Sequence, residues 1–571
     1  EGEMRLKAIG KAMAFLLTLL LFLSQAYGSQ ERVVDGYRIV TEMIPMRDGI
    51  KLATDIAFPK EEDGPYPVLL ARTPYGRKGT IDGFVKGDGR RFLDDGYVIA
   101  VQDTRGRSDS EGENVAFLAD GWVDHWDGYD TVEWLARQKW CNGKVGTFGG
   151  SALGITQYLL AGSAPPHLKA MHAWAACPDL YIYTIHQGGA LRKSLSVGWS
   201  KANKFNERTL DLFSYGRRIY DSFWKVRSLK NVIYRVSVPS VHVGGWFDIF
   251  SQGTLDAFVM MQHESAEGAR GRQKLIMGPW PHGIKRKVGE LEFPENAVKT
   301  PNFDMKDWFD YWIKGIDTGI FAKPPVDYYV MGDVDDPEAP GNEWRTAQDW
   351  PIPCRYTPLY LREGGKLTFE KPAEESSSQT YTYDPKNPVP TKGGPNLLIP
   401  AGLMDQRELE KRPDVLVFQT EPLEESVQVI GRVTVKLWAS SSCVDTDFVA
   451  KLMDVYPDGR SMLIADGIIR GRFRKSLSRE ELLEPGAVYE FDIDLWSTAI
   501  IFNKGHRIKL HITSSNHPRF DINPNTGRDY SEGCEMKVAE NTIYHDKKHP
   551  SHILLPIVPL GERGEEDERE K

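Results

Sequence analysis

KVGTFGGSALG, residues 144–154, is the stretch of sequence that decides the fold. An apolar run with strand character leads into Gly149 and Gly150, Ser151 follows, and apolar residues at helical spacing begin at Ile155. A sharp turn between a strand and a helix needs neighbours with little or no side chain, and it holds a serine in the strained, exposed position that suits a nucleophile. The glycine after this serine, Gly154, comes three residues later, whereas the usual motif places it two residues later. A flexible turn is the alternative interpretation.

The sequence around this turn alternates short β-branched runs with longer helical stretches. This alternation extends over residues 38–283 and predicts a mostly parallel sheet flanked by helices. An antiparallel hairpin turned at Arg47-Asp48-Gly49 is expected to precede it. Residues 178–236 are aromatic, charged and helical, and they indicate either a cap over the strand ends or ordinary packing helices. The predicted strands of the sheet are 67–73, 97–103, 144–149, 168–174, 239–245 and 274–279.

From Pro324 on, the composition changes to short strands separated by Gly, Pro and Asn, beginning with VDYYVMG. This spacing predicts an all-β sandwich. The polar stretch 371–396 is expected to be a long loop within it. The predicted fold class is therefore an α/β domain with an inserted helical cap, followed by an all-β domain of jelly-roll type. The predicted parts are a signal peptide (1–28), an α/β domain (29–323) with its cap (178–236), a β domain (324–560) and a charged, disordered tail (561–571).

The amino-terminal residues have the pattern of a secretory signal. Basic residues precede a short apolar run, 12–23, which small residues at Ala26 and Gly28 end. The run is too short for a bilayer core of roughly 30 Å. We therefore expect cleavage after Gly28 and a secreted or periplasmic protein without stable membrane insertion. An uncleaved anchor is the alternative.

Composition and charge exclude several other classes. Roughly 540 residues remain after cleavage, too many for one hydrophobic core. A net charge of −9 without a basic stripe argues against a nucleic-acid partner. Five scattered cysteines cannot complete a disulfide framework, although one pair could still form. The sequence leaves the oligomeric state open, so a homo-oligomer is compatible with it.

Two further residues follow predicted strands in the order that a catalytic triad requires. Asp248 ends VPSVHVGGWFD and His282 ends KLIMGPWPH, both after the serine in the chain. A hydroxyl becomes a good nucleophile when an imidazole takes its proton and a carboxylate orients that imidazole. Because parallel strands gather their ligands at one edge of the sheet, we predict Ser151, Asp248 and His282 as this triad. A turn aspartate and a surface histidine are the alternatives.

An oxyanion hole needs two donors aimed at the developing negative charge. The backbone N–H of Ala152 is the first candidate, and the loop that carries Tyr75 offers the second, with simple packing of Tyr75 as the alternative. Asp103 and Arg105 are expected to form a buried ion pair that fixes the neighbouring loop. No HExxH motif and no glycine-rich nucleotide loop occur, so we expect neither a metal nor a cofactor. The spacing of His545, His549 and His552 is attributed to a loop.

Taken together, RTPYGR, VQDTRGRSDSEG, GGSALG, GGWFD and GPWPH resemble the CocE/NonD hydrolases, which include esterases, acylases and Xaa-Pro dipeptidyl-peptidases. The resemblance continues in DTDFVAKLMDVYPDGRS and HRIKLHITSSNHPRFDINPNTG, which are similar to the C-terminal jelly roll of the dipeptidyl-peptidases, and covers residues 38–556. It implies an α/β-hydrolase fold, a cap over residues 178–236 and no cofactor. It also implies Ser151 as nucleophile, His282 as base, Asp248 as its orienter, and Tyr75 with the Ala152 N–H as the oxyanion hole.

Two departures from the family pattern bear on the substrate. Most members carry Tyr where this chain has Ala152, and relatives that act on α-amino acids place carboxylates after the catalytic Asp, where this chain has Ile249 and Phe250. A buried ammonium without a partner is costly, so an uncharged acyl group is expected, with Phe250 in its pocket or packed in the core. We predict a serine esterase or acylase acting on a small ester or amide. A dipeptidyl-peptidase, or a non-catalytic carbohydrate-binding or scaffolding protein, is the alternative.

Overall fold

The computed structural model describes residues 30–61, 64–300 and 303–560. The predicted signal peptide and charged tail lie outside these residues. Within them no helix is both long and apolar enough to span a bilayer. All five cysteines are free thiols, and Cys141, Cys177 and Cys443 are buried.

An eleven-stranded sheet in the order β1-β2-β3-β5-β4-β6-β7-β10-β11-β14-β15 forms the first half of the fold. Its centre, from β5 to β14, is parallel, and its edges are antiparallel. The central strands are buried on both faces, which is why their sequences are almost continuous apolar runs. The strands are β1 Gln30–Val34, β2 Tyr37–Pro45, β3 Lys51–Ala57, β4 Tyr66–Thr73, β5 Val98–Asp103, β6 Cys141–Gly150, β7 Leu168–Trp174, β10 Ser240–Gly245, β11 Lys274–Gly278, β14 Val326–Val330 and β15 Glu343–Ala347.

The six strands predicted from the alternation all form, as does the hairpin between β2 and β3. Helices cover the sheet, and α5 follows β6 directly after Ser151. Ser151, Asp248 and His282 come after β6, β10 and β11, so they lie at the same edge of the sheet. The helices of this part are α2 Arg77–Lys86, α3 Gly89–Asp94, α4 Asp127–Ala136, α5 Ala152–Gly162, α9 Ser251–Glu264, η3 Glu295–Val298, α10 Met305–Phe309 and η4 Asp310–Lys314, with the short hairpin β12 Lys287–Val288 and β13 Leu291–Glu292.

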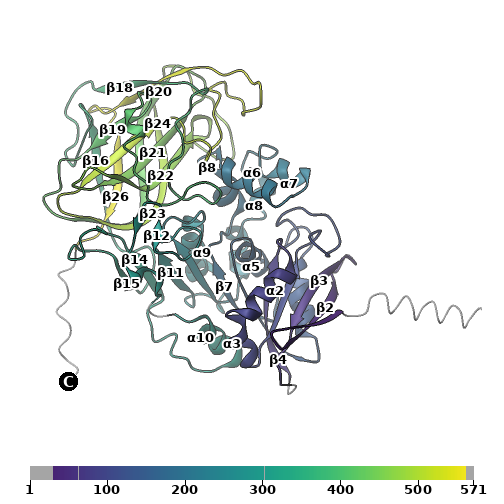
Figure 1. The fold of residues 1–571 in the computed structure, drawn as a ribbon. Coiled ribbons are helices and arrows are strands. Elements are labelled where there is room, and N and C mark those ends of the chain that lie inside the picture. The colour runs from purple at the N-terminus through teal and green to yellow at the C-terminus, as the bar shows by residue number, and fades with distance from the viewer. Residues whose placement is uncertain (1–29, 62–63, 301–302, 561–571) are drawn as a thin grey trace, which may run out of the picture.

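Residues 178–236 form short helices, and Figure 1 shows α6, α7 and α8 above the sheet and beside the β domain. This region also contains the two-residue hairpin β8 and β9, which the sequence did not predict because two residues are too few for a strand pattern. Its elements are η1 Tyr181–Ile185, β8 His186–Gln187, β9 Ala190–Leu191, α6 Lys193–Ala202, α7 Glu207–Leu212, α8 Ser222–Lys225 and η2 Leu229–Arg235.

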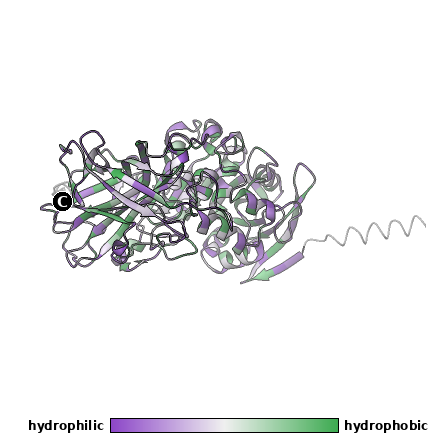
Figure 2. Ribbon diagram, turned by 90° about the horizontal axis from the view of Figure 1, so that it is seen from above, coloured by the Kyte–Doolittle hydropathy of each residue, from purple (hydrophilic) through white to green (hydrophobic). Residues whose placement is uncertain are grey.

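The second half is an all-β domain beside the first, as both views show (Figure 1 and Figure 2). Figure 2 shows hydrophobic residues concentrated along the strands and helices and hydrophilic residues in many of the peripheral loops. The strands of the β domain are β16 Arg355–Arg362, β17 Lys366–Thr368, β18 Ser378–Tyr383, β19 Leu416–Gln419, β20 Val427–Ser441, β21 Asp447–Val455, β22 Ser461–Arg470, β23 Tyr489–Phe502, β24 Arg507–Thr513, β25 Ala539–Tyr544 and β26 His552–Ile557, with the short helices η5 Leu409–Lys411 and η6 Gly471–Phe473.

Two predictions about this half were wrong. VDYYV was expected to begin the β sandwich, but it is β14 and runs parallel to β11 in the first sheet. The local pattern of a buried strand is the same in both sheets, so the partner strand decides its place. The stretch 371–396 was expected to be loop, but it contains β18, which pairs with β25. Alternating Thr and Tyr in β18 are favourable for a strand despite the polar surroundings.

The cap and the β domain are joined through buried charges. Arg470 pairs with Asp447 at 2.9 Å and with Asp521 at 2.8 Å, and all three side chains are almost fully buried. Asp521 also accepts a hydrogen bond from the Leu191 N–H of the cap at 3.0 Å. A Cβ at Gly188 would lie only 1.9 Å from the Ile468 carbonyl oxygen, so the cap hairpin touches the β domain backbone directly. The two parts therefore pack as one unit.

A buried histidine makes a second connection. His506 of the β domain lies between Asp454 at 2.9 Å and Asp333, in the loop after β14, at 3.2 Å. Burial alone would lower the pKa of His506, but the hydrogen bonds to these two carboxylates raise it above its usual value.

Candidate active site

Ser151 lies in a strained turn between β6 and α5. Its backbone has φ 57° and ψ −124°, a conformation that non-glycine residues rarely adopt and that is typical of functional turns. The turn also needs glycine on both sides. A Cβ at Gly150 would lie 2.0 Å from the Trp174 ring, and one at Gly154 would lie 2.5 Å from the Cβ of Ala176. The helix therefore packs tightly on β7 while the serine is held at the strand end.

Asp248 and His282 are in direct contact. The His282 Nδ1 lies 2.6 Å from the Asp248 Oδ2, and the other oxygen of Asp248 accepts the Phe250 N–H at 2.7 Å. Asp248 is fully buried, whereas the side chain of His282 is 12% exposed. A hydrogen bond from Nδ1–H to a carboxylate fixes the tautomer that leaves Nε2 free to accept a proton. Asp248 thus also caps its turn, as the alternative interpretation of this residue supposed.

Ser151 and His282 share the neighbours Trp174 and Phe250. Among the described residues no hydrogen bond joins the Ser151 hydroxyl to His282. The Trp174 carbonyl accepts the Ser151 N–H at 2.9 Å, and the Trp174 ring stacks on the His282 ring with 5.8 Å between centroids. The Phe250 ring meets His282 edge-on at 6.0 Å and lines the same pocket as Ser151. Catalytic hydrogen bonds are often long or poorly aligned without substrate and tighten when it binds.

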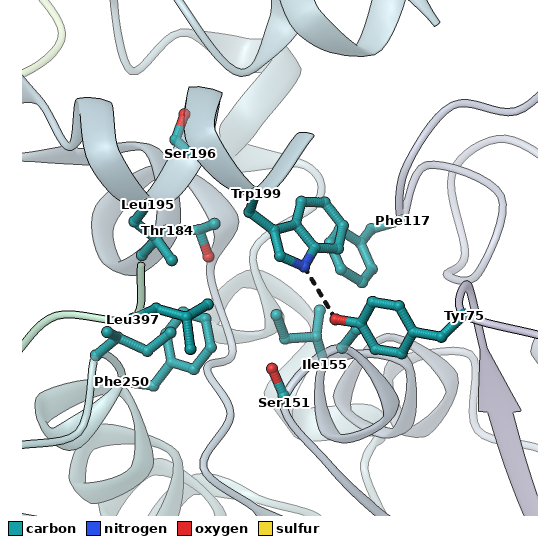
Figure 3. Close-up of a pocket in the computed structure, with 12 residues that line it drawn as sticks. Tyr75, Phe117, Ser151, Ile155, Thr184, Leu195, Ser196, Trp199, Phe250 and Leu397 are labelled. Carbon is teal, nitrogen blue, oxygen red and sulfur yellow. Dashed lines mark hydrogen bonds between the residues drawn. The ribbon is translucent and has the colours of Figure 1, made fainter. Parts of the chain in front are cut away.

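Tyr75 faces Ser151 across the pocket mouth (Figure 3). The Trp199 Nε1–H donates a hydrogen bond to the Tyr75 hydroxyl oxygen at 2.9 Å. Because indole is only a donor, the Tyr75 proton is not used in this bond and remains available to another acceptor. Burial raises the pKa of Tyr75, although the hydrogen bonds with Trp199 and Ser151 oppose this rise. The N–H of Ala152, the first residue of α5, has no acceptor within the helix.

The loop behind Tyr75 is fixed by buried ion pairs, but not by the predicted one. Asp103 pairs with Arg77 at 2.7 Å and also accepts the Arg77 N–H at 2.6 Å. Arg105 instead pairs with Asp127 at 2.6 Å and with Asp48 at 2.8 Å. The prediction that Asp103 pairs with Arg105 was therefore wrong. The turn after β5 directs the two side chains to different elements, and sequence proximity does not reveal this.

An apolar pocket opens above Ser151 (Figure 3). Its walls come from the turn at Ser151, the loops after β4 and β5, the cap, the start of α9 and one loop of the β domain. Its lining residues are Tyr75, Phe117, Ser151, Ala152, Ile155, Thr184, Leu195, Ser196, Trp199, Ile249, Phe250 and Leu397.

Sequence reasoning identified Tyr75 and Ser151 in this pocket but missed Thr184, Ser196 and most of the apolar walls. Phe117, Trp199 and Leu397 carry no motif and come from segments far apart in the chain. Leu397 lies in the loop after β18, which Asn396 fixes by donating to the carbonyls of Gly393 at 2.7 Å and Pro400 at 3.0 Å. Only the tertiary structure brings this loop over the serine.

The described residues contain no group of three or more His, Cys, Asp or Glu that could hold a metal ion. His545, His549 and His552 each have a different partner. The Nδ1 atoms of His545 and His552 lie 2.9 Å from the Ser377 hydroxyl and 2.8 Å from the Pro550 carbonyl, and His549 pairs with Asp546 at 3.2 Å. These three side chains therefore do not form a common site.

Comparison with known proteins identifies the family. Residues 48–219 and 215–284 match the family profile of the X-Pro dipeptidyl-peptidases (S15 family), and residues 318–554 match that of the X-Pro dipeptidyl-peptidase C-terminal non-catalytic domain. The cocaine esterase of Rhodococcus sp. (strain MB1 Bresler) is 36% identical over 92% of this chain and all of its own length. The chain belongs to the CocE/NonD family of serine hydrolases.

Similar solved structures agree in fold. An aminopeptidase from a marine sediment archaeon, Thaumarchaeota archaeon, superposes with a TM-score of 0.79 at 28% identity, covering 92% of this chain and 97% of that one. An alpha-amino acid ester hydrolase superposes with a TM-score of 0.75 at 28% identity, covering 93% and 98%. The α/β-hydrolase fold with a C-terminal β domain is thus confirmed. The chain is a serine hydrolase of the esterase type, so an inert binding protein is not favoured.

Proposed function

We propose that Ser151 is the nucleophile and His282 the general base. Asp248 orients the imidazole and stabilises the positive charge that it gains when it takes the proton. His282 Nε2 takes the proton as the Ser151 oxygen attacks a carbonyl carbon, and it returns this proton to the leaving group. His282 then takes a proton from water as the water oxygen attacks the acyl carbon, and the Ser151 oxygen leaves with that proton, which releases the acid. The short contact between His282 and Asp248, together with the strained turn at Ser151, supports these roles.

The Tyr75 hydroxyl and the Ala152 N–H are proposed as the oxyanion hole. Both border the space above the Ser151 oxygen, and the bond from Trp199 turns the Tyr75 oxygen so that its own proton is free. The raised pKa of Tyr75 keeps this proton in place at neutral pH, where the group must donate.

The substrate is proposed to be an ester with a small, uncharged, apolar acyl group, and Phe250 is proposed to contact this group. The lining of the pocket carries this proposal, because none of its described residues bears a charge. A free amino terminus in this pocket would bury an ammonium group without a counter-ion, at a cost of several kcal/mol.

Labelling and kinetics test the nucleophile together. A fluorophosphonate probe is expected to label the wild type and the Ser151→Ala variant is expected to remain unlabelled. Hydrolysis of nitrophenyl butyrate is expected to fall at least ~10³-fold in that variant. Ser376→Ala, an exposed serine of the β domain, is the matched control and should behave as the wild type. Equal labelling of wild type and Ser151→Ala would refute the assignment.

An Xaa-Pro dipeptidyl-peptidase is the second candidate, because the match to the S15 family profile favours it. Nitrophenyl butyrate and Gly-Pro-nitroanilide separate the two candidates. We expect efficient ester hydrolysis and little release of nitroaniline. Efficient anilide cleavage with weak ester turnover would reverse the choice.

We also propose secretion by a signal peptide at residues 1–28 and a division of the mature chain into an α/β domain with its cap at 178–236 and a β domain. The basic and apolar pattern of the first residues supports export. Mass spectrometry of the protein secreted by a bacterial host should give a chain that begins at Ser29. Retention of residues 12–23 in the secreted or membrane fraction would refute cleavage.

A further inference from the structure

A second apolar cavity adjoins the acyl pocket and is not used by the proposed reaction. It is small and shares one lining residue with the first pocket, Phe117. The lining residues of this second cavity are Phe117, Leu118, Gly121, Trp122, Val123, Leu159, Leu180 and Arg227.

The two cavities follow one another in a line that leads away from the nucleophile. Ser151 at the start of α5 and Ile155 line the first pocket, and Leu159, one helical turn after Ile155, lines the second. The opposite wall repeats this step, because Thr184 lines the first cavity and Leu180 the second. One turn is about 5 Å, which is roughly the length of four methylene groups. The second cavity therefore continues the first in the direction of a bound acyl chain.

The Phe117 ring is the common wall. It is 7% exposed and stacks on the Trp199 ring, with 5.6 Å between centroids and 13° between planes, and on Phe213 at 6.3 Å. The backbone of Phe117 has φ 65°, a left-handed conformation that non-glycine residues rarely adopt. Arg227 of the cap also lines the second cavity, and it pairs with Asp124 at 2.8 Å. Apart from Arg227, the side chains that line the space behind Phe117 are apolar.

We propose that Phe117 sets the acyl-chain length accepted by this enzyme, and that the cavity behind it is a latent subsite for the distal methylene groups of a straight, uncharged acyl chain. This inference rests on the proposed function, because it takes Ser151 as the attacking group. The wild type accepts chains that end before Phe117. Removing the ring joins the two cavities and admits longer chains.

The test compares nitrophenyl butyrate with nitrophenyl octanoate by kcat/KM. In the wild type the ratio of octanoate to butyrate should be well below one. In Phe117→Ala this ratio should rise at least tenfold, since each methylene group moved from water into the second cavity gains about fourfold. Phe117→Val is the second variant in case the alanine variant does not fold. Gly121→Leu combined with Phe117→Ala should remove the gain, because a side chain at Gly121 enters ordinary contact with Leu159 and fills the second cavity.

Phe205→Ala is the matched control for loss of an aromatic neighbour of Trp199. Phe205 packs on Trp199 with 4.8 Å between centroids but lines neither cavity, so its removal should leave the chain-length ratio unchanged. A wild type that hydrolyses octanoate as well as butyrate, or an unchanged ratio in a folded Phe117 variant, overturns the inference. Failure of Ser151 labelling and of all ester hydrolysis would instead refute the proposed function.

Discussion

Because Trp199 donates a hydrogen bond to the Tyr75 hydroxyl, we expect the losses of kcat in variants of these two residues to be coupled. Tyr75→Phe removes a donor to the oxyanion and should lower kcat by ~10²–10³-fold while KM changes little. Trp199→Phe keeps an aromatic ring beside Phe117 but removes the indole N–H, which lies 2.9 Å from the Tyr75 oxygen. A hydrogen bond between uncharged groups makes a net contribution of about 1 kcal/mol. Loss of the bond that orients the Tyr75 hydroxyl should therefore lower kcat roughly fivefold.

A double-mutant cycle with nitrophenyl butyrate measures this coupling. If Trp199 acts by orienting Tyr75, the indole N–H has nothing to orient in the Tyr75→Phe background, and the double variant should be no slower than Tyr75→Phe alone. Circular dichroism and thermal unfolding of each variant establish that the fold is retained. Burial raises the pKa of Tyr75, so this hydroxyl stays protonated below about pH 10. The shape of the kcat–pH profile below that pH should therefore be the same in Tyr75→Phe and in the wild type.

Two results would refute this reasoning. A Tyr75→Phe enzyme within threefold of the wild type would mean that the hydroxyl does not stabilise the oxyanion. A fivefold loss from Trp199→Phe that persists in the Tyr75→Phe background would mean that the indole acts on substrate binding by itself, because independent effects multiply.

Three further predictions concern the triad, the turn and the connection between domains. Asp248→Asn should lower kcat by at least ~10³-fold with a smaller change in KM, measured with the same ester. Gly150→Ala forces a Cβ to 2.0 Å from the Trp174 ring and should lower the free energy of unfolding by more than about 2 kcal/mol in urea titrations. The raised pKa of His506 beside Asp454 gives stability that is complete below about pH 6.5 and is lost as pH rises through the folded-state pKa; His506→Gln should flatten this pH dependence of unfolding.

The sequence predicts the parts of the fold whose signal is local. The central parallel strands are buried on both faces, so runs such as PVLLART and YVIAVQD identify them without knowledge of their partners. The turn at Ser151 is equally local, since its glycines answer steric needs within a few residues. The contact between Asp248 and His282 followed from chain order, because both residues come after neighbouring strands.

Features that depend on distant partners could not be predicted. β14 has the pattern of any buried strand, and only its pairing with β11 assigns it to the first sheet. Asp103 and Arg105 are two residues apart, yet each pairs with a different segment. Trp199 of the cap and Leu397 of the β domain line the same pocket as the serine, and their local sequences give no sign of this.

The position of Leu397 in the pocket indicates how enzymes of this family can change their substrate selectivity. The loop that carries it joins β18 to the helix η5, and most of the loop lies outside the ladders of both sheets. Changes in its length or side chains can therefore alter selectivity without disturbing the reacting groups or either scaffold. New preferences for substrates can arise in a domain that holds none of the chemistry, and mutagenesis libraries aimed at selectivity should include it.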